Sequence, residues 1–165
     1  MKGSIKCLMI GAEKILVSEK PVKNLGVWLD SKLSMDAHIT KPCSAAFYYL
    51  YNIRRIRRYL SKESTESLIH AFISSRLDYC NSLFYNIPAY QLEKLQRIQN
   101  AAARLILKES KFTPLLMTLH WLPVKYRIHF KILLLTLKAI NLFSPSYIWD
   151  LVTLKKPSSY NLLKI

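Results

Sequence analysis

Glycine and acidic residues are both scarce in this chain. Only 3 of its 165 residues are glycine, and 10 Asp and Glu stand against 25 Lys and Arg. So few glycines disfavour a loop-rich all-β architecture, whose many tight turns favour glycine at positions of positive φ. With 51% hydrophobic and 12% aromatic residues, the composition is that of a globular domain. A mainly helical domain is therefore the first expectation.

Residue patterns that support common enzyme chemistry are also absent from the sequence. No two aspartates have the adjacent or near-adjacent spacing that two-metal phosphoryl transfer needs, and no GxSxG, HExxH, phosphate-loop or GxGxxG motif occurs. Cys7, Cys43 and Cys80 lack CxxC spacing, and the four histidines are scattered, so neither a metal site nor a disulfide framework is predicted. We assign no catalytic residue, metal or cofactor.

Long hydrophobic runs are missing as well. The longest purely apolar run in the second half, Ile132 to Leu135, falls far short of the ~20 residues that a membrane span requires. Near the start, Lys6 interrupts any signal-peptide core. We therefore expect a soluble intracellular protein, with nucleus and cytoplasm both open. The run Arg54, Arg55, Arg57 and Arg58 fits a nuclear signal or, more simply, a contact with nucleic acid.

The first thirty residues favour strands. Short apolar or β-branched runs cover Ile5 to Ile10, Lys14 to Ser18 and Leu25 to Leu29, separated by Gly11, Pro21 and Gly26. Such a small strand cluster is marginal alone, so it should pack on the helices that come after it in the chain. We divide the chain into strands and a hairpin over 1–34, a helical domain over 35–153, and a polar tail over 154–165.

From Asp36 onward, apolar residues recur at helical spacing, which predicts a helical bundle. The first helix should bury Ala46, Tyr49, Leu50, Ile53, Ile56 and Leu60. Ser61 should cap a second helix that buries Leu68, Ile69, Phe72, Ile73 and Leu77. A third, from Tyr90 to Lys108, should bury Leu92, Leu95, Ile98, Ala102, Leu105 and Ile106. A fourth, from Pro123 to Asn141, is apolar around most of its circumference and should be the most buried member, and a short helix over Tyr147 to Val152 should come last.

Positive charge is abundant and ordered. The formal net charge of +15 attracts polyanions, of which nucleic acid is the commonest soluble one, although a solvated basic surface or a ribosomal or anionic-membrane contact also fits. Three predicted helices repeat a basic face opposite their apolar face. We therefore predict phosphate contacts at Arg54, Arg55, Arg58, Arg97, Arg104 and Lys108.

Four collinear strings resemble the reverse transcriptase of non-LTR retrotransposons, in the group of Jockey and chicken-repeat-like elements. They are KNLGVWLDSKLSMDAHI from Lys23, STESLIHAFISSRLDYCNSLFYNIP from Ser64, LEKLQRIQNAAARLI from Leu92, and LHWLPVKYRIHFKILLLTLKAIN from Leu119. In that family these segments come after the catalytic palm. The resemblance implies that the LGVWLD segment is a primer-grip hairpin, with Leu25 and Gly26 near the primer, and that the helices form a thumb and connecting region.

The resemblance also implies what such a piece does. A thumb holds template and primer by the nucleic-acid backbone, without reading sequence. Gly26 lacks a β-carbon that would obstruct a primer phosphate, and Trp28 either stacks near the grip or belongs to the core. The family's palm, with its Mg²⁺-binding aspartates, has no counterpart here. We expect a truncated or decayed copy, or a partial gene model, with no polymerase activity of its own.

Three hypotheses for function result. The leading one is a fragment that binds RNA, DNA or hybrid duplex nonspecifically. A second is a remnant with no retained function. A third is a domesticated interaction module whose apolar face, uncovered without the palm, binds that missing domain or another protein. The string SRLDY from Ser75 favours an Arg76 to Asp78 pairing at a helix end and a hydrogen-bonded tyrosine over a chemical role.

Overall fold

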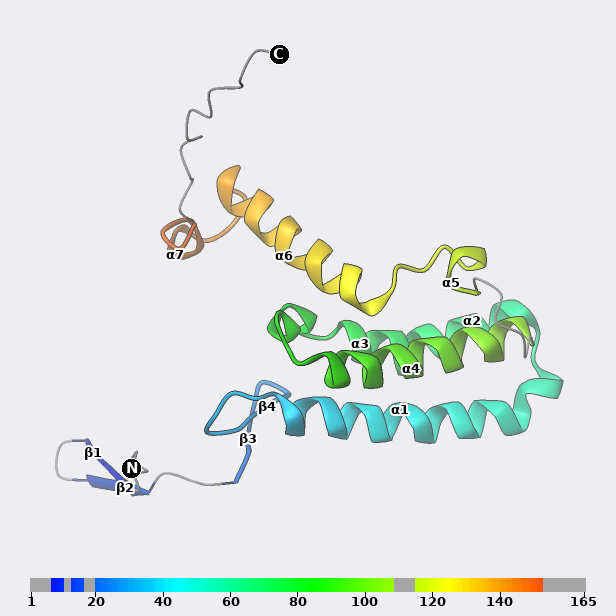
Figure 1. Cartoon of the computed structure of the whole chain (residues 1–165), viewed down its shortest axis with the longest axis horizontal. Helices are drawn as coiled ribbons and strands as arrows, with labels where there is room; N and C mark the ends of the chain where they lie inside the picture. The colour runs from blue at the N-terminus through cyan, green and yellow to red at the C-terminus, as the bar shows by residue number, and fades with distance from the viewer. Residues whose placement is uncertain (1–6, 11–12, 17–19, 109–114, 153–165) are drawn as a thin grey trace, which may run out of the picture.

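The computed structural model describes residues 7–10, 13–16, 20–108 and 115–152, and within them the chain is mainly helical with small hairpins at its N-terminal end (Figure 1). This confirms the predicted fold class. The strands predicted near residues 5–10 and 14–18 form β1 (Cys7–Ile10) and β2 (Glu13–Leu16), which pair antiparallel. Their predicted outer ends, and the polar tail over 154–165, lie outside the described residues.

A second hairpin joins β3 (Val22–Asn24) to β4 (Val27–Leu29). Its two-residue turn, Leu25–Gly26, has φ values of +45° and +85°. Positive φ at both central residues is typical of the turn type whose twist matches paired strands. The sequence predicts a single strand over Leu25 to Leu29, whereas the structure starts the strand at Val27 and uses the two residues before it to reverse the chain.

Three helical segments lie side by side and form the bundle. They are α1 (Asp36–Ile56), the segment of α2 (Lys62–Ile69), η2 (His70–Ser74) and α3 (Ser75–Asp78), and α4 (Ala89–Leu107). In Figure 1, α1 and α4 run in the same direction, and the α2 to α3 segment runs in the opposite direction. The 3-10 turns η1 (Arg57–Tyr59) and η3 (Asn81–Phe84) make the connections.

The core lies where these segments meet. Ile39, Ile69, Ile73, Leu95, Ile98 and Ile106 are its largest fully buried apolar side chains. The predicted inward positions of the third helix are buried or half-buried in α4. Two glutamines that the sequence did not single out, Gln91 and Gln99, are also 1% exposed. Both use their side-chain amides to bond segments outside α4, at Asp36 and at Leu122.

The middle segment begins as predicted and then departs from regular geometry. The Ser61 hydroxyl accepts a hydrogen bond from the Ser64 amide, so the predicted N-cap is confirmed. Residues His70–Ser74 form a π-helix, a wider turn. Ile69, Ile73 and Leu77 are all buried along it, whereas Phe72 is 38% exposed and not inward as predicted.

The C-terminal part of the structure leaves the bundle. After α5 (Leu115–Thr118), α6 (Val124–Ile140) begins against α4 and then diverges, and α7 (Ser146–Trp149) comes after it (Figure 1). Only Val124, Ile128 and Ala139 of α6 are buried. The prediction that this helix is the most buried one is therefore wrong, because no segment among the described residues covers its other sides. None of the described helices combines the length and hydropathy needed to cross a membrane.

Candidate nucleic-acid interface

Arg57 joins the C-terminal ends of α1 and α4. It is 8% exposed, and its Nε and Nη2 donate to the carbonyl oxygens of Leu105 and Ile106 at 2.8 and 2.9 Å. Its Nη1 donates to the Leu60 carbonyl at 2.8 Å. The last carbonyls of a helix lack partners within the helix and carry partial negative charge, so a guanidinium there satisfies both needs. The basic run at residues 54–58 is thus interrupted by one buried structural arginine.

The sequence contained a signal for this burial. Ala46, Leu50, Ile53 and Arg57 are separated by four, three and four residues, so Arg57 continues the buried face of α1. The structure places it inward and leaves Ile56, predicted to be buried, 46% exposed. A bidentate guanidinium can be buried where its donors are matched by carbonyl oxygens, and the C-terminal end of α4 supplies them.

The Arg57 contacts bring five of the predicted phosphate contacts to one end of the bundle. Arg54, Arg55 and Arg58 are exposed on α1 and η1, and Arg104 and Lys108 are exposed at the end of α4. Arg58 also lies over the Tyr59 ring, with its Cζ 4.7 Å from the ring centroid. We call these five residues the end cluster.

Arg97 stands apart from the end cluster. It lies in the middle of α4 and pairs with Glu93 at 3.7 Å, with both side chains largely exposed. An exposed pair one helical turn apart contributes only a few tenths of a kcal/mol, so Arg97 remains accessible to a phosphate.

Leu25 and Gly26 lie at the other end of α1. The Tyr79 hydroxyl donates to the Leu25 carbonyl oxygen, which fixes the hairpin turn to the end of α3. A β-carbon at Gly26 would lie 3.2 Å from the Tyr79 hydroxyl oxygen. Glycine is thus required here by its φ of +85° and by a contact inside the protein, independently of any approach by a primer.

Basic and aromatic groups surround this hairpin. Lys41 Nζ lies over the Trp28 ring, 2.8 Å from its centroid, and Trp28 is half-buried. A hollow of about 360 Å³ lies beside the turn, lined by Gly26, His38, Pro42, Ser75, Arg76 and Tyr79. Arg76 is held by its Nε bond to the Phe72 carbonyl and by stacking on the Tyr49 ring.

The predicted pairing of Arg76 with Asp78 is not formed. Asp78 instead accepts from Arg127 of α6 at 2.9 Å, which ties the start of α6 to the bundle. Burial raises the pKa of Asp78 and outweighs the opposing effect of the Arg127 charge. The hydrogen-bonded tyrosine predicted in the same string is present as Tyr79.

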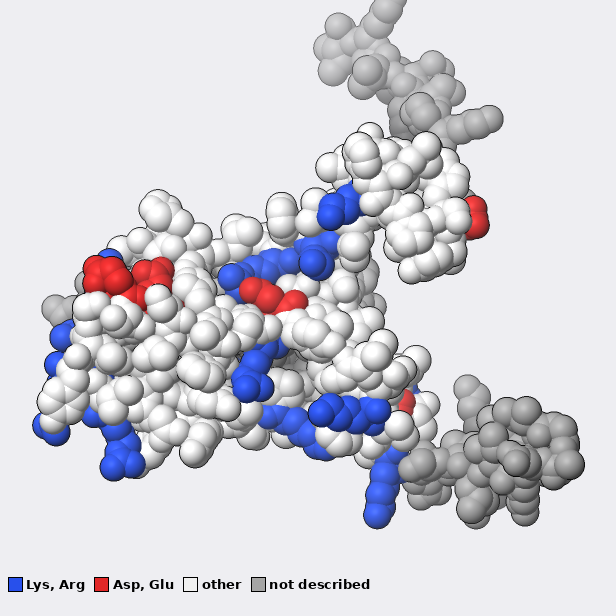
Figure 2. All heavy atoms as spheres, turned by 180° about the vertical axis from the view of Figure 1, so that it is seen from behind, with Lys and Arg blue, Asp and Glu red and all other residues white. Residues whose placement is uncertain are grey.

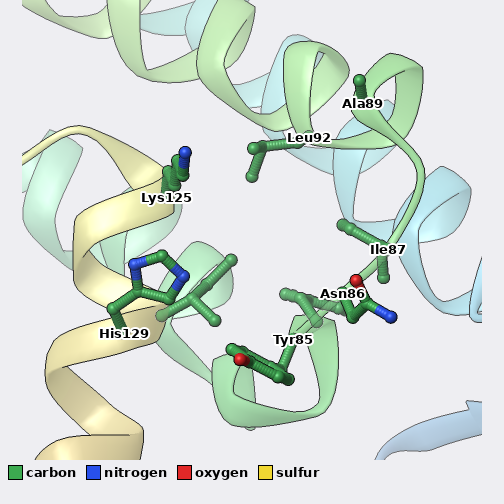
Figure 3. Close-up of a pocket in the computed structure, with 9 residues that line it drawn as sticks. Tyr85, Asn86, Ile87, Ala89, Leu92, Lys125 and His129 are labelled. Atoms are coloured by element: carbon green, nitrogen blue, oxygen red, sulfur yellow. The ribbon is translucent and has the colours of Figure 1, made fainter.

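A further hollow, of about 300 Å³, lies between the start of α4 and α6 (Figure 3). Lys125 and His129 of α6 line one side, and Tyr85, Asn86 and Ile87 line the other. Among the described residues, no three His, Cys, Asp or Glu side chains are placed to hold a metal ion. In the hollow beside the turn, the Ser75 hydroxyl donates to the Ala71 carbonyl oxygen.

Two buried titratable groups complete the electrostatics. Burial raises the pKa of the Cys43 thiol to about 11, so this cysteine stays protonated and unreactive. Burial also lowers the pKa of His38. The neutral ring suits its geometry, because the Trp28 amide donates to His38 Nδ1 at 3.5 Å.

Apart from Arg97, the predicted contacts fall into two groups, one at each end of α1. The hairpin lies at one end of this 21-residue helix and the end cluster at the other, about 30 Å apart at 1.5 Å per residue. Figure 2 shows Lys and Arg atoms along the lower edge of the bundle, where few acidic atoms lie, and a second basic group near α6 with acidic atoms beside it. This arrangement allows phosphate groups to be bound along α1.

Comparisons with known protein families, with curated proteins and with solved structures find no match to this chain.

Proposed function

We propose that this chain is a fragment of a non-LTR retrotransposon reverse transcriptase that binds nucleic acid through its backbone and has no polymerase activity of its own. The end cluster carries the proposal. Buried Arg57 ties two helix ends together, and basic side chains from both helices therefore share one end of the bundle. Charges held on a rigid scaffold lose little entropy when they meet phosphates.

The hairpin and the end cluster together suit a long polyanion. A DNA duplex carries one charge per about 1.7 Å of its axis, so a duplex lying along α1 passes roughly eighteen phosphates over about 30 Å. Contacts to the phosphate backbone carry no base information, so binding of this kind is nonspecific in sequence. The resemblance of the LGVWLD segment to a primer grip agrees with this orientation.

The affinity of the full chain for an RNA and DNA hybrid duplex, measured over a salt series, tests this function. A plot of log affinity against log salt should have a slope steeper than about −3. The variant with Arg54, Arg55 and Arg58 changed to Ala should flatten the slope by about 2 to 3, because each lost phosphate contact removes nearly one released counterion.

A charge-matched variant provides the control. Lys125, Lys131 and Lys138 are exposed on α6, and changing all three to Ala removes the same net charge away from the end cluster. This variant should retain a steeper slope than the arginine variant. Equal effects of both variants would mean that the end cluster acts only through general electrostatic attraction. If the unaltered chain does not bind at low salt, the chain is a remnant without polymerase-derived function.

A second candidate function, protein binding, is favoured by the apolar surface of α6 and α7. Phe130, Leu133 and Leu137 of α6 and Leu142, Phe143 and Tyr147 beyond them are each more than half exposed. Monomers rarely expose a contiguous apolar patch of this kind. We propose this surface as the site of the interaction module, with a polymerase palm domain as its partner.

Lysine substitutions test the second candidate. Changing Leu133 and Leu137 to Lys should abolish self-association of the chain in sedimentation, while the hybrid-duplex affinity stays as high as before or rises with the added charge. If the unaltered chain is monomeric at every concentration and the variant behaves identically, the apolar surface does not drive association.

A further inference from the structure

Solvent-exposed tyrosines lie on α1 and η1. Tyr48 and Tyr51 are 63% and 61% exposed, and Tyr59 at the end of the same segment is 73% exposed. Tyr48, Tyr51 and Arg55 are separated by three and four residues, which places them on one strip of α1, and Tyr59 lies four residues later in η1, where the helix has 3-10 geometry. The strip faces away from the core, because the buried residues of α1 lie on the opposite side.

These tyrosines differ from the one beside them. The Tyr49 ring stacks on Phe72 with centroids 4.9 Å apart, and Arg76 lies over it, so Tyr49 joins α1 to the middle segment. Tyr48 touches only the edge of Tyr49 among these rings, at 5.6 Å. Tyr51 and Tyr59 have arginines near their faces, Arg55 at 6.0 Å and Arg58 at 4.7 Å. Core packing therefore explains Tyr49 and leaves the other three rings unexplained.

The surrounding charge identifies the kind of ligand that such a strip would bind. Between Asp36 and Glu63 the sequence contains six Lys and Arg and no acidic residue. Five of the six are exposed, since only Arg57 is buried. Exposed aromatic rings interleaved with arginines, in a segment without carboxylates, match a ligand that has both flat rings and negative charges.

We propose that the strip of Tyr48, Tyr51, Arg55 and Tyr59 is a stacking surface for unpaired bases, and that the ligand held along α1 includes single-stranded nucleic acid. Every base has a π-face, so stacking on tyrosine is tolerant of sequence. Phosphates of the same strand lie within reach of Arg54, Arg55 and Arg58. In a duplex the faces of the bases are covered by their neighbours, so a duplex leaves the tyrosines without a role.

The dimensions of the strip suit a short strand. Tyr48 and Tyr59 are eleven residues apart, which is about 16 Å along the axis at 1.5 Å per residue. A stacked single strand covers that length with about five nucleotides at 3.4 Å each. Tyr48 and Tyr51 lie about 5 to 6 Å apart at their β-carbons, close enough for successive unstacked bases of one strand.

This inference rests on the proposed function for the class of ligand and adds which form of nucleic acid is held. The two fail separately. The proposed function fails if the arginine variant binds the hybrid duplex as the unaltered chain does. The stacking proposal fails if substituting the tyrosines leaves the affinity for single strands unchanged, whatever the affinity for the duplex.

Four probes of equal length, titrated against the full chain by fluorescence anisotropy, make the test. They are oligothymidylate, oligouridylate, a blunt RNA and DNA hybrid duplex, and an abasic strand with the same phosphates and no bases. The variant with Tyr48 and Tyr51 changed to Leu should bind both base-bearing strands roughly tenfold or more weakly. Its affinity for the duplex and for the abasic strand should not change.

Two matched variants separate stacking from other effects. Changing Tyr48 and Tyr51 to Phe keeps the rings and should keep the single-strand affinity. Tyr85 and Tyr126, similarly exposed outside α1, serve as the control pair, and changing them to Leu should leave all four affinities unaltered. Circular dichroism melting of each variant verifies that it is folded.

Two results would overturn the stacking surface. Equal single-strand affinity of the Leu variant and the unaltered chain removes the role of the rings. Loss of self-association in the Leu variant, with single-strand affinity retained, makes the strip a contact with protein. A larger effect with oligouridylate than with oligothymidylate would support the surface and assign it to RNA.

Discussion

Helices α4 and α6 are similar in length and opposite in how they use apolar residues. Eight of the 19 residues of α4 are buried, including two glutamines, whereas only three of the 17 residues of α6 are. Yet α6 has the more continuous apolar sequence, with Ile132 to Leu135 in its middle. A striped helix finds its partners within the chain, and a helix that is apolar all round needs partners on several sides. Within the described residues, α6 meets the bundle only along its first half, and its end contacts the short helix α7.

The comparison shows that apolar residues have different roles in the two regions of this chain. In the bundle they report folding, because each apolar stripe is matched by a neighbouring segment. Beyond Ile132, which packs against the core, Ala139 is the one buried residue of α6, and the larger apolar groups of α6 and α7 are exposed or half-buried. Four changes test this contrast, beginning with the largest expected effect.

Replacing Arg57 with Ala should lower the free energy of unfolding by about 3 to 5 kcal/mol. It removes three charge-assisted hydrogen bonds and leaves the carbonyls of Leu105 and Ile106 buried without partners. Urea unfolding monitored by circular dichroism measures it. Arg58→Ala, one residue away and exposed, should stay within about 0.5 kcal/mol. Equal effects of the two would contradict the joining of α1 to α4 by Arg57.

Two truncations within α6 compare its halves directly. Ile128→Ala should cost about 3 kcal/mol, because Ile128 is 3% exposed and truncation leaves a cavity. Leu133→Ala, five residues on, should cost less than about 0.5 kcal/mol, because Leu133 is 67% exposed. A concentration-dependent cost at Leu133, seen by repeating the urea titration at several protein concentrations, would show that another copy of the chain covers it.

Two strained leucines test whether the regions unfold together. Leu25 in the hairpin and Leu142 after α6 both have positive φ, at +45° and +59°, and both are highly exposed. Asn accepts this conformation more readily, so Leu25→Asn should stabilise the bundle by about 0.5 kcal/mol through the Tyr79 contact. Leu142→Asn should leave the unfolding of the bundle unchanged. An equal gain from both would make the bundle and the arm of α6 and α7 one cooperative unit.

Acid should weaken the bundle through His38. Its folded pKa lies below the unfolded value of 6.5, so the unfolded chain binds the proton first as the pH falls. The stability contribution is therefore present above pH 6.5 and is lost as the pH falls from 6.5 through the folded pKa. Urea unfolding at pH 7.5 and pH 5 should show a smaller decline in His38→Asn than in the unaltered chain. An identical decline would show that the effect does not come from His38.

Much of the bundle could be predicted from spacing in the sequence. Apolar residues at helical intervals predict the burial along α4, and Ser61 predicts the start of α2, because both depend on local geometry. The burial of α6 was not predictable in this way, because periodicity says which face is apolar and not whether anything covers it. Ile56 was predicted to be buried and Arg57 to be exposed because the prediction relied on whether each residue is apolar and not on its position around the helix.

The candidate site divides similarly. The exposed arginines could be predicted from the basic faces of the helices. Their position at one end of the bundle depends on hydrogen bonds from Arg57 to carbonyls that lie 48 and 49 positions later in the chain. The reason for Gly26 was equally remote from the local sequence, since Tyr79 lies 53 residues later. For the tyrosines of α1, the sequence analysis predicted that Tyr49 is buried and made no prediction for its neighbours Tyr48 and Tyr51.

The π-helical turn at His70–Ser74 determines how this segment would respond to the loss of a residue. In a regular α-helix, four-residue steps drift by about 40° each, so Ile69, Ile73 and Leu77 would turn progressively away from one line. The wider turn absorbs that drift and keeps all three buried. A π-helical turn holds one residue more than the α-helical turn it replaces. Deleting one residue between Ile69 and Ile73 would place Ile69, Ile73 and Leu77 at intervals of three and four residues in a regular α-helix, which keeps them on one face, so Asp78 and Tyr79 would stay near Arg127 and Leu25.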